Sequence, residues 1–273
     1  MARLKIIIFF ILLSYSYLLK ATTDSTLRLQ LTKTIVGNFS NFSVDNLGNI
    51  FIITASNQIK KLNNNFDSVG NFNDVKRYGN IYTIDVSNPL KILVYYKDFA
   101  TIIMLDKQLS NRNTINLRQQ NILQVKAIAQ SYDNNIWLFD ELESKLKKID
   151  ETGKLLLETA DFRLLFDDAA TPQSIIDMNG LLYLYNIRKG WTIFDYYGGL
   201  KHQYPLPNWQ DVQVTDSYLR GRDSCFFYAS NPKQLQFIKA NSSVDISTAL
   251  KVTVQQNKVY ILTTKGLEIY SIL

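Results

Sequence analysis

The sequence predicts an all-β fold: a six-bladed β-propeller of four-stranded blades whose ring is closed by an N-terminal strand. Three observations predict it. A short β-forming run occurs six times, a second apolar run follows each of them, and a spare strand-like segment precedes the first repeat. A four-stranded propeller blade takes about 40–45 residues, so the chain has room for six.

The repeat is clearest in a four-residue run rich in the aliphatic and aromatic residues that favour β-strands. Successive runs start 42, 44, 46, 43 and 34 residues apart, which is close to the spacing of propeller blades. The runs are apolar on both faces, as expected for a middle strand that neighbouring blades cover on each side. They occupy residues 50–53, 92–95, 136–139, 182–185, 225–228 and 259–262.

The second run follows eight to ten residues later and has the form apolar–x–x–apolar–polar in most repeats. It occupies residues 59–63, 102–106, 146–150, 191–195, 235–239 and 267–271. A turn signal such as residues 45–49 precedes the first run, and a short apolar stretch ahead of that turn supplies another strand. A weaker fourth strand is expected at residues 68–72, 114–117, 155–160, 202–206 and 245–249.

The ends of the chain predict how the ring closes. The sixth repeat has no room for a fourth strand before Leu273, whereas residues 27–36 form a strand-like segment ahead of the first repeat. Pairing this segment with the last blade would cover an otherwise exposed edge. Rings of five or seven blades and a β-sandwich remain alternatives, because the final interval of 34 residues is the weakest repeat.

The first repeat carries a family resemblance. It reads Phe42-Ser43-Val44-Asp45, then Gly48-Asn49-Ile50-Phe51, then Ile59-Lys60-Lys61-Leu62. This pattern resembles the repeat of the NHL and gluconolactonase-like six-bladed propellers, and the third repeat is the other close match. The resemblance spans the chain after residue 21 and implies the fold but no particular activity.

Residues 1–21 have the layout of a secretory signal peptide. Arg3 and Lys5 precede an apolar run at residues 6–13, and small or polar residues follow from Ala21. The run is shorter than the roughly 20 residues that a membrane span needs. We expect cleavage near residue 21, a single propeller domain over residues 22–273, no membrane span after cleavage, and a periplasmic or extracellular location. An uncleaved N-terminal anchor is the alternative.

Charge and cysteine content narrow the function. The formal charge of +6 falls to about +3 without the signal, and the basic residues are scattered, so no nucleic-acid partner is expected. Cys225 is the single cysteine and excludes an intramolecular disulfide. Its place in a middle-strand run predicts a buried, small apolar side chain. The twin lysines at residues 60–61 and 147–148 share one repeat position and are expected on solvated strand surface.

No catalytic constellation is found. The resemblance to metal-dependent propellers that hydrolyse lactones would require carboxylates and Asn at the entrances of the innermost strands, because a hard cation needs several oxygen ligands. Those entrances, at residues 41–43, 81–83, 126–128, 174–176, 212–214 and 250–252, contain no carboxylate, and Lys251 would oppose a cation. His202 is the single histidine and lies on a predicted outer strand. We expect no catalytic residue, metal or cofactor.

The candidate binding face consists of loops that join second to third strands and of connections between blades. Aromatic and arginine side chains in such loops often anchor interfaces. The candidate binding residues are Trp209, Arg188, Lys189, Phe99, Asp98, Arg77, Tyr78, Asp140 and Glu141, and the loop at residues 230–232 is assigned to the same face. Trp209 either anchors a partner or packs over the end of its own blade.

The sequence therefore favours an exported, non-enzymatic binding or scaffold protein with a protein partner, for example in a cell-envelope complex. A divergent metal-dependent lactonase or hydrolase is one alternative. A carbohydrate-binding lectin is another, and a small molecule or a glycan remains open as a ligand.

Overall fold

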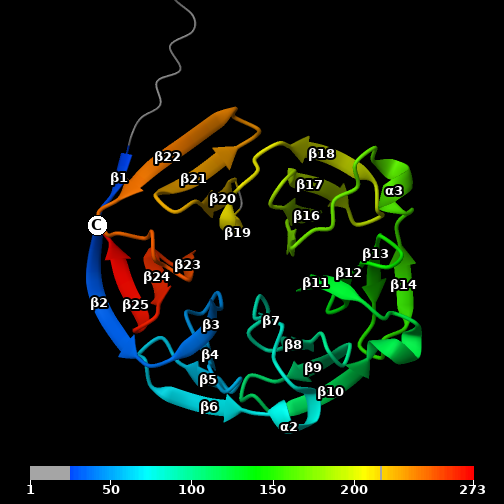
Figure 1. Cartoon of the computed structure of the whole chain (residues 1–273), viewed down its shortest axis with the longest axis horizontal. Coiled ribbons are helices and arrows are strands. Elements are labelled where there is room, and N and C mark those ends of the chain that lie inside the picture. Colours follow the sequence, from blue (N-terminus) through cyan, green and yellow to red (C-terminus); the bar gives the residue numbers. More distant parts are fainter. Residues whose placement is uncertain (1–24, 216) are drawn as a thin grey trace, which may run out of the picture.

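The computed structural model describes residues 25–215 and 217–273, which form a ring of six β-sheets around a central channel (Figure 1). The predicted signal peptide lies outside the described residues. In each sheet the first strand lies at the channel and the last at the rim. The predicted six-bladed propeller is confirmed.

The first four blades are each built from four consecutive strands. Blade 1 contains β3 (Phe39–Val44), β4 (Ile50–Thr54), β5 (Ile59–Leu62) and β6 (Ser68–Phe72). Blade 2 contains β7 (Thr83–Asp85), β8 (Ile92–Tyr96), β9 (Thr101–Leu105) and β10 (Asn111–Asn116). Blade 3 contains β11 (Val125–Gln130), β12 (Ile136–Asp140), β13 (Lys145–Ile149) and β14 (Leu155–Glu158). Blade 4 contains β15 (Ser174–Met178), β16 (Leu181–Asn186), β17 (Gly190–Asp195) and β18 (Leu200–Tyr204).

The last two blades include the N-terminal strands. Blade 5 contains β19 (Gln210–Val214), β20 (Leu219–Arg222), β21 (Phe226–Asn231) and β22 (Gln236–Ser242), with β1 (Ser25–Leu27) added in parallel to β22. Blade 6 contains β23 (Lys251–Gln255), β24 (Lys258–Thr263) and β25 (Gly266–Ile272), and β2 (Leu29–Val36) completes it. Short helical turns connect three pairs of neighbouring elements: α2 (Val75–Tyr78), η2 (Leu117–Gln120) and α3 (Phe162–Leu165).

The core is divided among the six contacts between neighbouring blades. Each contact has its own cluster of buried apolar side chains. Strands β4, β8 and β12 are buried at every residue, because a blade lies against each of their faces. This arrangement explains why the middle strands are apolar without alternation.

The polar residue that ends the second predicted run has a structural role. Asp106 follows β9, and its Oδ1 accepts hydrogen bonds from the backbone amides of Gln108 (2.8 Å) and Ser110 (2.9 Å). The same two bonds, to the second and fourth following residues, are made by Asn63, Asp150 and Asp195. The repeat therefore requires a short carboxylate or amide side chain here, because it fixes the turn between the third and fourth strands.

The N-terminal segment closes the ring as predicted. Strand β2 pairs antiparallel with β25, from Leu29 opposite Ile272 to Val36 opposite Gly266. Strand β1 then continues onto the neighbouring blade 5, where Ser25 lies opposite Ala240. One continuous segment therefore joins the last two blades at the rim (Figure 1).

The prediction for the fifth blade is wrong by one strand. The second strand is β20, and residues 225–228 fall at the start of the third strand, β21. Residues 235–239 consequently fall at the start of the fourth strand, and residues 245–249 form no strand. Strand β20 escapes sequence detection because Arg220, Gly221 and Arg222 interrupt its apolar pattern. Cys225 accordingly lies in the β20–β21 turn and is exposed, which corrects the expected burial.

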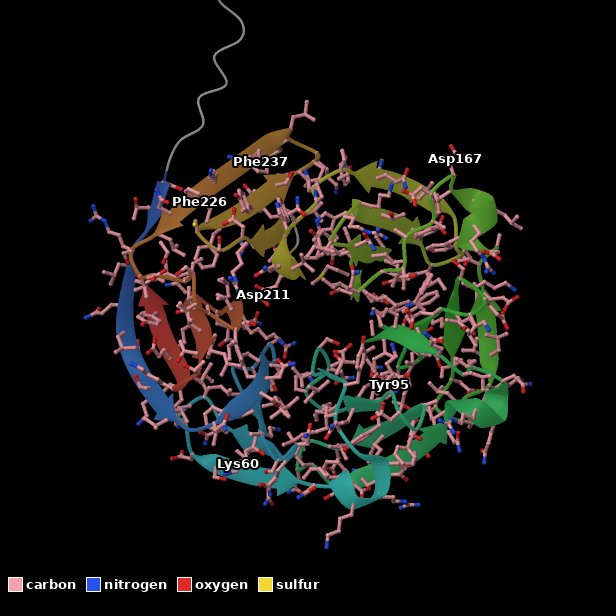
Figure 2. The ribbon with its side chains drawn as sticks, viewed as in Figure 1. Lys60, Tyr95, Asp167, Asp211, Phe226 and Phe237 are labelled. Atoms are coloured by element: carbon pink, nitrogen blue, oxygen red, sulfur yellow. The ribbon has the colours of Figure 1, made fainter. Side chains whose placement is uncertain are left out.

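The lysine prediction is also wrong for three of the four residues. Lys60 points outward at the rim of the ring (Figure 2), but Lys61, Lys147 and Lys148 are buried. Each buried ammonium group has an acceptor: Lys61 donates to the carbonyl of Lys107 (2.6 Å), Lys147 to Asp140 (2.8 Å) and Lys148 to Asp133 (2.6 Å). Buried lysines need such partners, and those partners come from turns that the sequence pattern does not pair with them.

Removing the closing strand tests the architecture. A chain that begins at Gly37 lacks β1 and β2, so the β25 edge and the apolar residues beneath it become exposed. Cross-strand pairs contribute roughly 0.2–1 kcal/mol each, and we expect a loss of a few kcal/mol in chemical denaturation together with self-association in size-exclusion chromatography. A chain that begins at Ser25 is the control. Equal stability and a monomeric state for both chains would contradict the closure.

The Asp133–Lys148 pair predicts a pH dependence. Burial opposes ionisation of Asp133, but hydrogen bonds from Lys148, Ser131 and Asn135 outweigh it and lower the carboxyl pKa to about 2. A depressed carboxyl pKa stabilises the fold above the unfolded value near 3.8, and this contribution is lost as the pH falls toward 2. Asp133→Asn should cost about 1 kcal/mol at pH 7, allowing for solvent screening. The stabilities of the two proteins should converge as the pH falls toward 2, and a gap that does not depend on pH would contradict this assignment.

Candidate binding surfaces

The two faces of the ring carry different loops. We call binding face the one made by the loops between second and third strands and by the connections between blades, and turn face the opposite one. The nine candidate binding residues all belong to elements that end at the binding face. Residues 230–232 do not, because the corrected strand order places the β21–β22 turn on the turn face.

Four candidates form one cluster beside blade 2. The Tyr78 ring lies 5.4 Å from the ring of Tyr96 and meets Phe99 edge-on at 6.4 Å. The Arg77 guanidinium lies 5.0 Å from the Tyr78 ring. Tyr78 is buried, whereas Phe99 is 48% exposed, so Phe99 and Arg77 are the accessible members. Asp98 belongs to the same loop as Phe99 and is also exposed.

Arg118 was not identified from the sequence but belongs to this surface. It lies in η2 and donates a hydrogen bond to the carbonyl of Asp98 (2.8 Å). A single Arg in a polar connection gives no repeat signal, and only the fold brings it to the β8–β9 loop.

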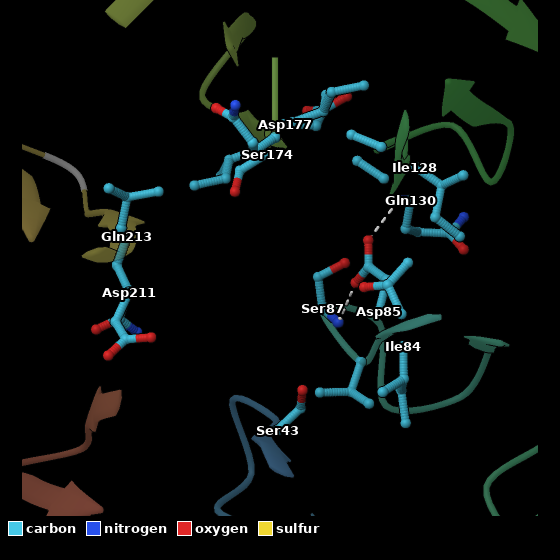
Figure 3. Close-up of a pocket in the computed structure, with 18 of the residues that line it drawn as sticks. Ser43, Ile84, Asp85, Ser87, Ile128, Gln130, Ser174, Asp177, Asp211 and Gln213 are labelled. Carbon is cyan, nitrogen blue, oxygen red and sulfur yellow. Dashed lines mark hydrogen bonds between the residues drawn. The ribbon is translucent and has the colours of Figure 1, made fainter. Parts of the chain in front are cut away.

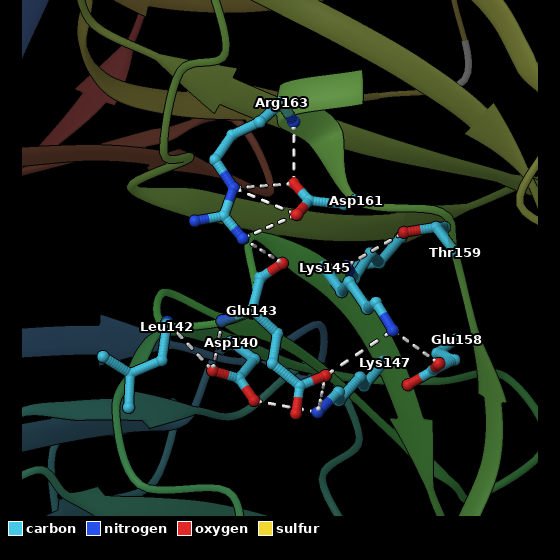
Figure 4. Close-up of polar contacts among 10 residues, drawn as sticks. Asp140, Leu142, Glu143, Lys145, Lys147, Glu158, Thr159, Asp161 and Arg163 are labelled. Carbon is cyan, nitrogen blue, oxygen red and sulfur yellow. Dashed lines mark hydrogen bonds and ion pairs between the residues drawn. The ribbon is translucent and has the colours of Figure 1, made fainter. Parts of the chain in front are cut away.

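Asp140 has a structural role in the surrounding polar network (Figure 4). Its side chain is 1% exposed, accepts from Lys147 (2.8 Å) and also accepts from the backbone amide of Leu142 (3.0 Å). Burial opposes the charge of Lys147, yet hydrogen bonds to Asp140 and Glu143 raise the pKa of its ammonium group. Asp140 thus neutralises a buried lysine and shapes the loop, and it offers no surface to a partner.

Glu141 lies where blades 2 and 3 meet. Its carboxylate accepts from Lys97 of blade 2 (3.2 Å) and from Gln124 at the start of blade 3 (3.0 Å). The Glu141 carboxylate therefore holds two adjacent loops together. Its side chain remains partly exposed, so it is still accessible to a partner.

Arg188 and Lys189 lie in the β16–β17 loop and are exposed. Lys189 forms an ion pair with Asp168 in the connection after α3. That connection and the β16–β17 loop border a cavity of about 560 Å³ whose walls include Phe162, Phe166 and Leu184. Asp167, on the same connection, is also exposed (Figure 2).

Trp209 packs inside the ring. Its side chain is 5% exposed and stacks on Tyr228, with ring centroids 5.6 Å apart and an interplanar angle of 5°. Its backbone amide donates to the hydroxyl of Tyr185 (2.7 Å). Gly221 lies against the indole, and a Cβ there would come within 2.9 Å of it. Of the two interpretations of Trp209, the structure therefore shows the packing role, between blades 4 and 5.

The central channel encloses about 500 Å³ and is lined by the first strands of all six blades (Figure 3). Three of its residues are carboxylates, Asp85, Asp177 and Asp211. Asp211 falls outside the predicted entrance at residues 212–214, because β19 begins two residues earlier than expected. The statement that the strand entrances contain no carboxylate is therefore wrong for blade 5.

Each channel carboxylate binds groups of the protein itself. Asp85 accepts from the amide of Gln130 in blade 3 (2.7 Å), and Asp211 accepts from the amide of Val252 in blade 6 (2.8 Å). Asp177 accepts from the indole Nε1 of Trp137 in blade 3 (3.2 Å). The carboxylates thus tie neighbouring blades together at the channel wall. Among the described residues, no cluster of three or more His, Cys, Asp or Glu side chains could hold a metal ion.

Lys251 joins blades 6 and 1 at the wall of the channel. Its ammonium group donates to the side chain of Asn41 (2.9 Å) and to the carbonyl of Phe42 (2.8 Å). Burial lowers its pKa, and the charge of Asp211 partly opposes that shift. His202 lies far from this group, exposed on the outer strand β18 beside Tyr204.

The variant Trp209→Ala tests whether the Trp209 side chain packs in the core or is free to bind a partner. Loss of a buried tryptophan should cost about 3–5 kcal/mol, and Trp209→Phe should cost less because it keeps an aromatic ring against Tyr228. Denaturant titration measures both. Wild-type stability in Trp209→Ala would show that the indole is not part of the core and would return Trp209 to the binding face.

Comparisons with known proteins agree with the fold. No family model and no curated protein matches the sequence. The WD40 domain of Neurospora crassa Pan2 superimposes with a TM-score of 0.66 at 9% identity, covering 92% of this chain and 97% of that one. An inactive virginiamycin B lyase from Staphylococcus aureus, with quinupristin, gives 0.61 at 11% identity, covering 91% and 99%.

A third similar structure is PorZ, a bacterial surface component of the type-IX secretion system of Porphyromonas gingivalis. It gives a TM-score of 0.56 at 12% identity, covering 86% of this chain and 32% of that one. No helix among residues 25–215 and 217–273 is long and apolar enough to cross a membrane. At these identities the similarities establish the β-propeller fold and nothing further about activity.

Proposed function

We propose that this chain is an exported, non-enzymatic scaffold that binds a protein partner through its binding face, as part of a cell-envelope complex. The proposal rests mainly on an arc of exposed apolar side chains that crosses blades 2 and 3. Phe99, Leu123, Leu142 and Leu164 belong to four successive connections of the binding face and are 48%, 55%, 53% and 83% exposed. Export rests on the composition of residues 1–21.

Backbone and side-chain contacts hold the members of the arc next to one another. Arg118 joins η2 to the loop of Phe99 through the carbonyl of Asp98. The backbone amide of Glu141 donates to the carbonyl of Gln124 (2.8 Å), which places Leu123 and Leu142 on adjacent loops. Arg163 donates to the carbonyl of Glu143 (3.3 Å) and so joins α3, with Leu164, to the same loop.

The composition of the arc fits a protein interface. Large apolar side chains are accompanied by exposed Arg77, Arg118 and Arg163, and aromatic, aliphatic and arginine side chains are typical of interface anchors. Single exposed apolar residues need no explanation, but a connected row of them on one face does. The three arginines favour a partner with acidic residues around an apolar centre.

The alternatives have less support from the geometry. A metal-dependent hydrolase needs several oxygen ligands that converge on one point, whereas the three channel carboxylates each bind a neighbouring blade. Stoichiometric calcium or zinc in exhaustively dialysed protein would nevertheless favour the enzyme. A lectin would require several exposed aromatic rings on one face, but Trp209 is buried, and Phe99 is the exposed aromatic residue among the candidates on the binding face.

Charge substitutions in the arc test the proposal. The double variant Leu123→Glu, Leu142→Glu should keep the stability of the wild type, because both side chains are exposed, but should weaken partner capture at least tenfold. The measurement is quantitative pull-down from native envelope extract with immobilised mature protein. Tyr197→Glu is the matched control, since Tyr197 is 90% exposed on the turn face. Equal capture by the wild type and the double variant would overturn the assignment of the face.

A further inference from the structure

A third cavity lies between blades 5 and 6, apart from the central channel and from the cavity bordered by the β16–β17 loop. It encloses about 390 Å³, within the range of roughly 300–1,000 Å³ that is usual for small-molecule sites. Its walls are mainly apolar and come from β20 to β23, with Leu27 of β1 and Ile272 of β25. The polar side chains in the lining include Asp211, which is paired with Arg222, and Gln213 of β19. It is separate from the arc, because its lining residues belong to blades 5 and 6 and to β1, whereas the arc crosses blades 2 and 3.

The cavity exists because blade 5 presents small side chains to blade 6. Phe227 lies opposite Ala240, and Ala229 lies opposite Ile238, so two of the three cross-strand pairs on this side contain an alanine, the third being Asn231 opposite Gln236. In blade 2 the third strand β9 instead carries Ile102 and Met104 on the side that faces the next blade, and Ile102 lies opposite Ile115 of β10.

The burial of the third strand also differs between blades 2 and 5. Strand β9, the third strand of blade 2, is buried throughout, whereas residues 226–230 of β21, the third strand of blade 5, are only half-buried. In the core cluster between blades 5 and 6, the fully buried residues come from blade 6 and from Ile246 in the preceding connection, and none comes from blade 5. The two blades are thus incompletely packed against each other.

Arg220 supplies a charge to the wall of this cavity. It lies on β20 opposite Ala229, and its guanidinium carbon lies 6.0 Å from the ring of Tyr218. No ion pair joins Arg220 to another described side chain. Arg222, two residues further along the same strand face, differs: it binds Asp211 (2.6 Å) and the carbonyl of Ala249 (3.1 Å).

We propose that this cavity binds a small amphipathic carboxylate, with its apolar body between blades 5 and 6 and its carboxylate on Arg220. The apolar walls exclude a strongly hydrated ligand, because its polar groups would lose their water without replacement. A planar guanidinium matches a carboxylate through two parallel hydrogen bonds. A neutral apolar ligand would fill the same space but would leave Arg220 without an anion.

Two variants separate binding from a mere packing defect. Ala229→Leu fills the cavity, so it should abolish ligand binding while keeping or raising the melting temperature. Arg220→Gln keeps the cavity but removes the charge. Ala240→Val is a second filling variant in case Ala229→Leu fails to fold, and Arg112→Gln, at an arginine that is 73% exposed on β10, controls for general loss of positive charge.

The probes are hexanoate, octanoate and decanoate, each compared with the alcohol of the same length by calorimetric titration and thermal shift. We expect at least one carboxylate to bind the wild type and raise its melting temperature. Arg220→Gln should weaken binding of that carboxylate at least tenfold without changing the affinity for the alcohol, and Arg112→Gln should bind both as the wild type does. Failure of all three carboxylates to bind the wild type, or undiminished binding by either filling variant, would overturn the proposal. Neither result bears on the protein-binding face.

Discussion

The antiparallel pairing of β2 with β25 is the interaction on which the rest of the ring depends. Each blade buries its middle strands only if a neighbour lies on both sides, so an open ring would leave two blades half-covered. The closing strand also removes the free edge of the last blade. Because β1 continues onto blade 5, the same segment holds the weakest contact between blades at the rim. Strands that are far apart in the sequence therefore depend on one another for their stability.

Polar groups at the channel reinforce this closure from inside. The bonds of Asp85 to blade 3, of Asp211 to blade 6 and of Lys251 to blade 1 each run from one first strand to the next. Buried charges are costly unless they are fully hydrogen-bonded, and here the acceptors and donors are backbone groups that the inner strands leave unpaired. The charged side chains of the channel thus hold neighbouring blades together. Their presence therefore does not by itself indicate a ligand site.

The sequence determines most of the fold because a blade is a local structure. The middle strands are recognisable from continuous apolar runs, and the third-to-fourth turn from the short polar residue typified by Asp106, whose bonds reach only four residues along the chain. The errors concern long-range partners. The burial of Lys61 depends on a carbonyl 46 residues away, and the pairing of Trp209 with Tyr228 depends on the order of strands in blade 5. The arc could be predicted from the sequence only in part. Phe99 lies in a predicted loop, but Leu123 and Arg118 come close to it only in the folded chain.

Blade 5 is where both the repeat and the packing depart from the other blades, and the two departures have one cause. Arg220, Gly221 and Arg222 hide β20 from the pattern, and the same residues shape the surroundings of the cavity. Gly221 makes room for Trp209 on one face, Arg222 fixes Asp211 on the other, and Arg220 remains available at the wall. Local departures from a consistent pattern are expected where a protein uses stability for function. The third strand of blade 2 carries Ile102 and Met104 toward the next blade, where β21 carries Phe227 and Ala229, so the proposed ligand site explains a feature that the architecture alone does not.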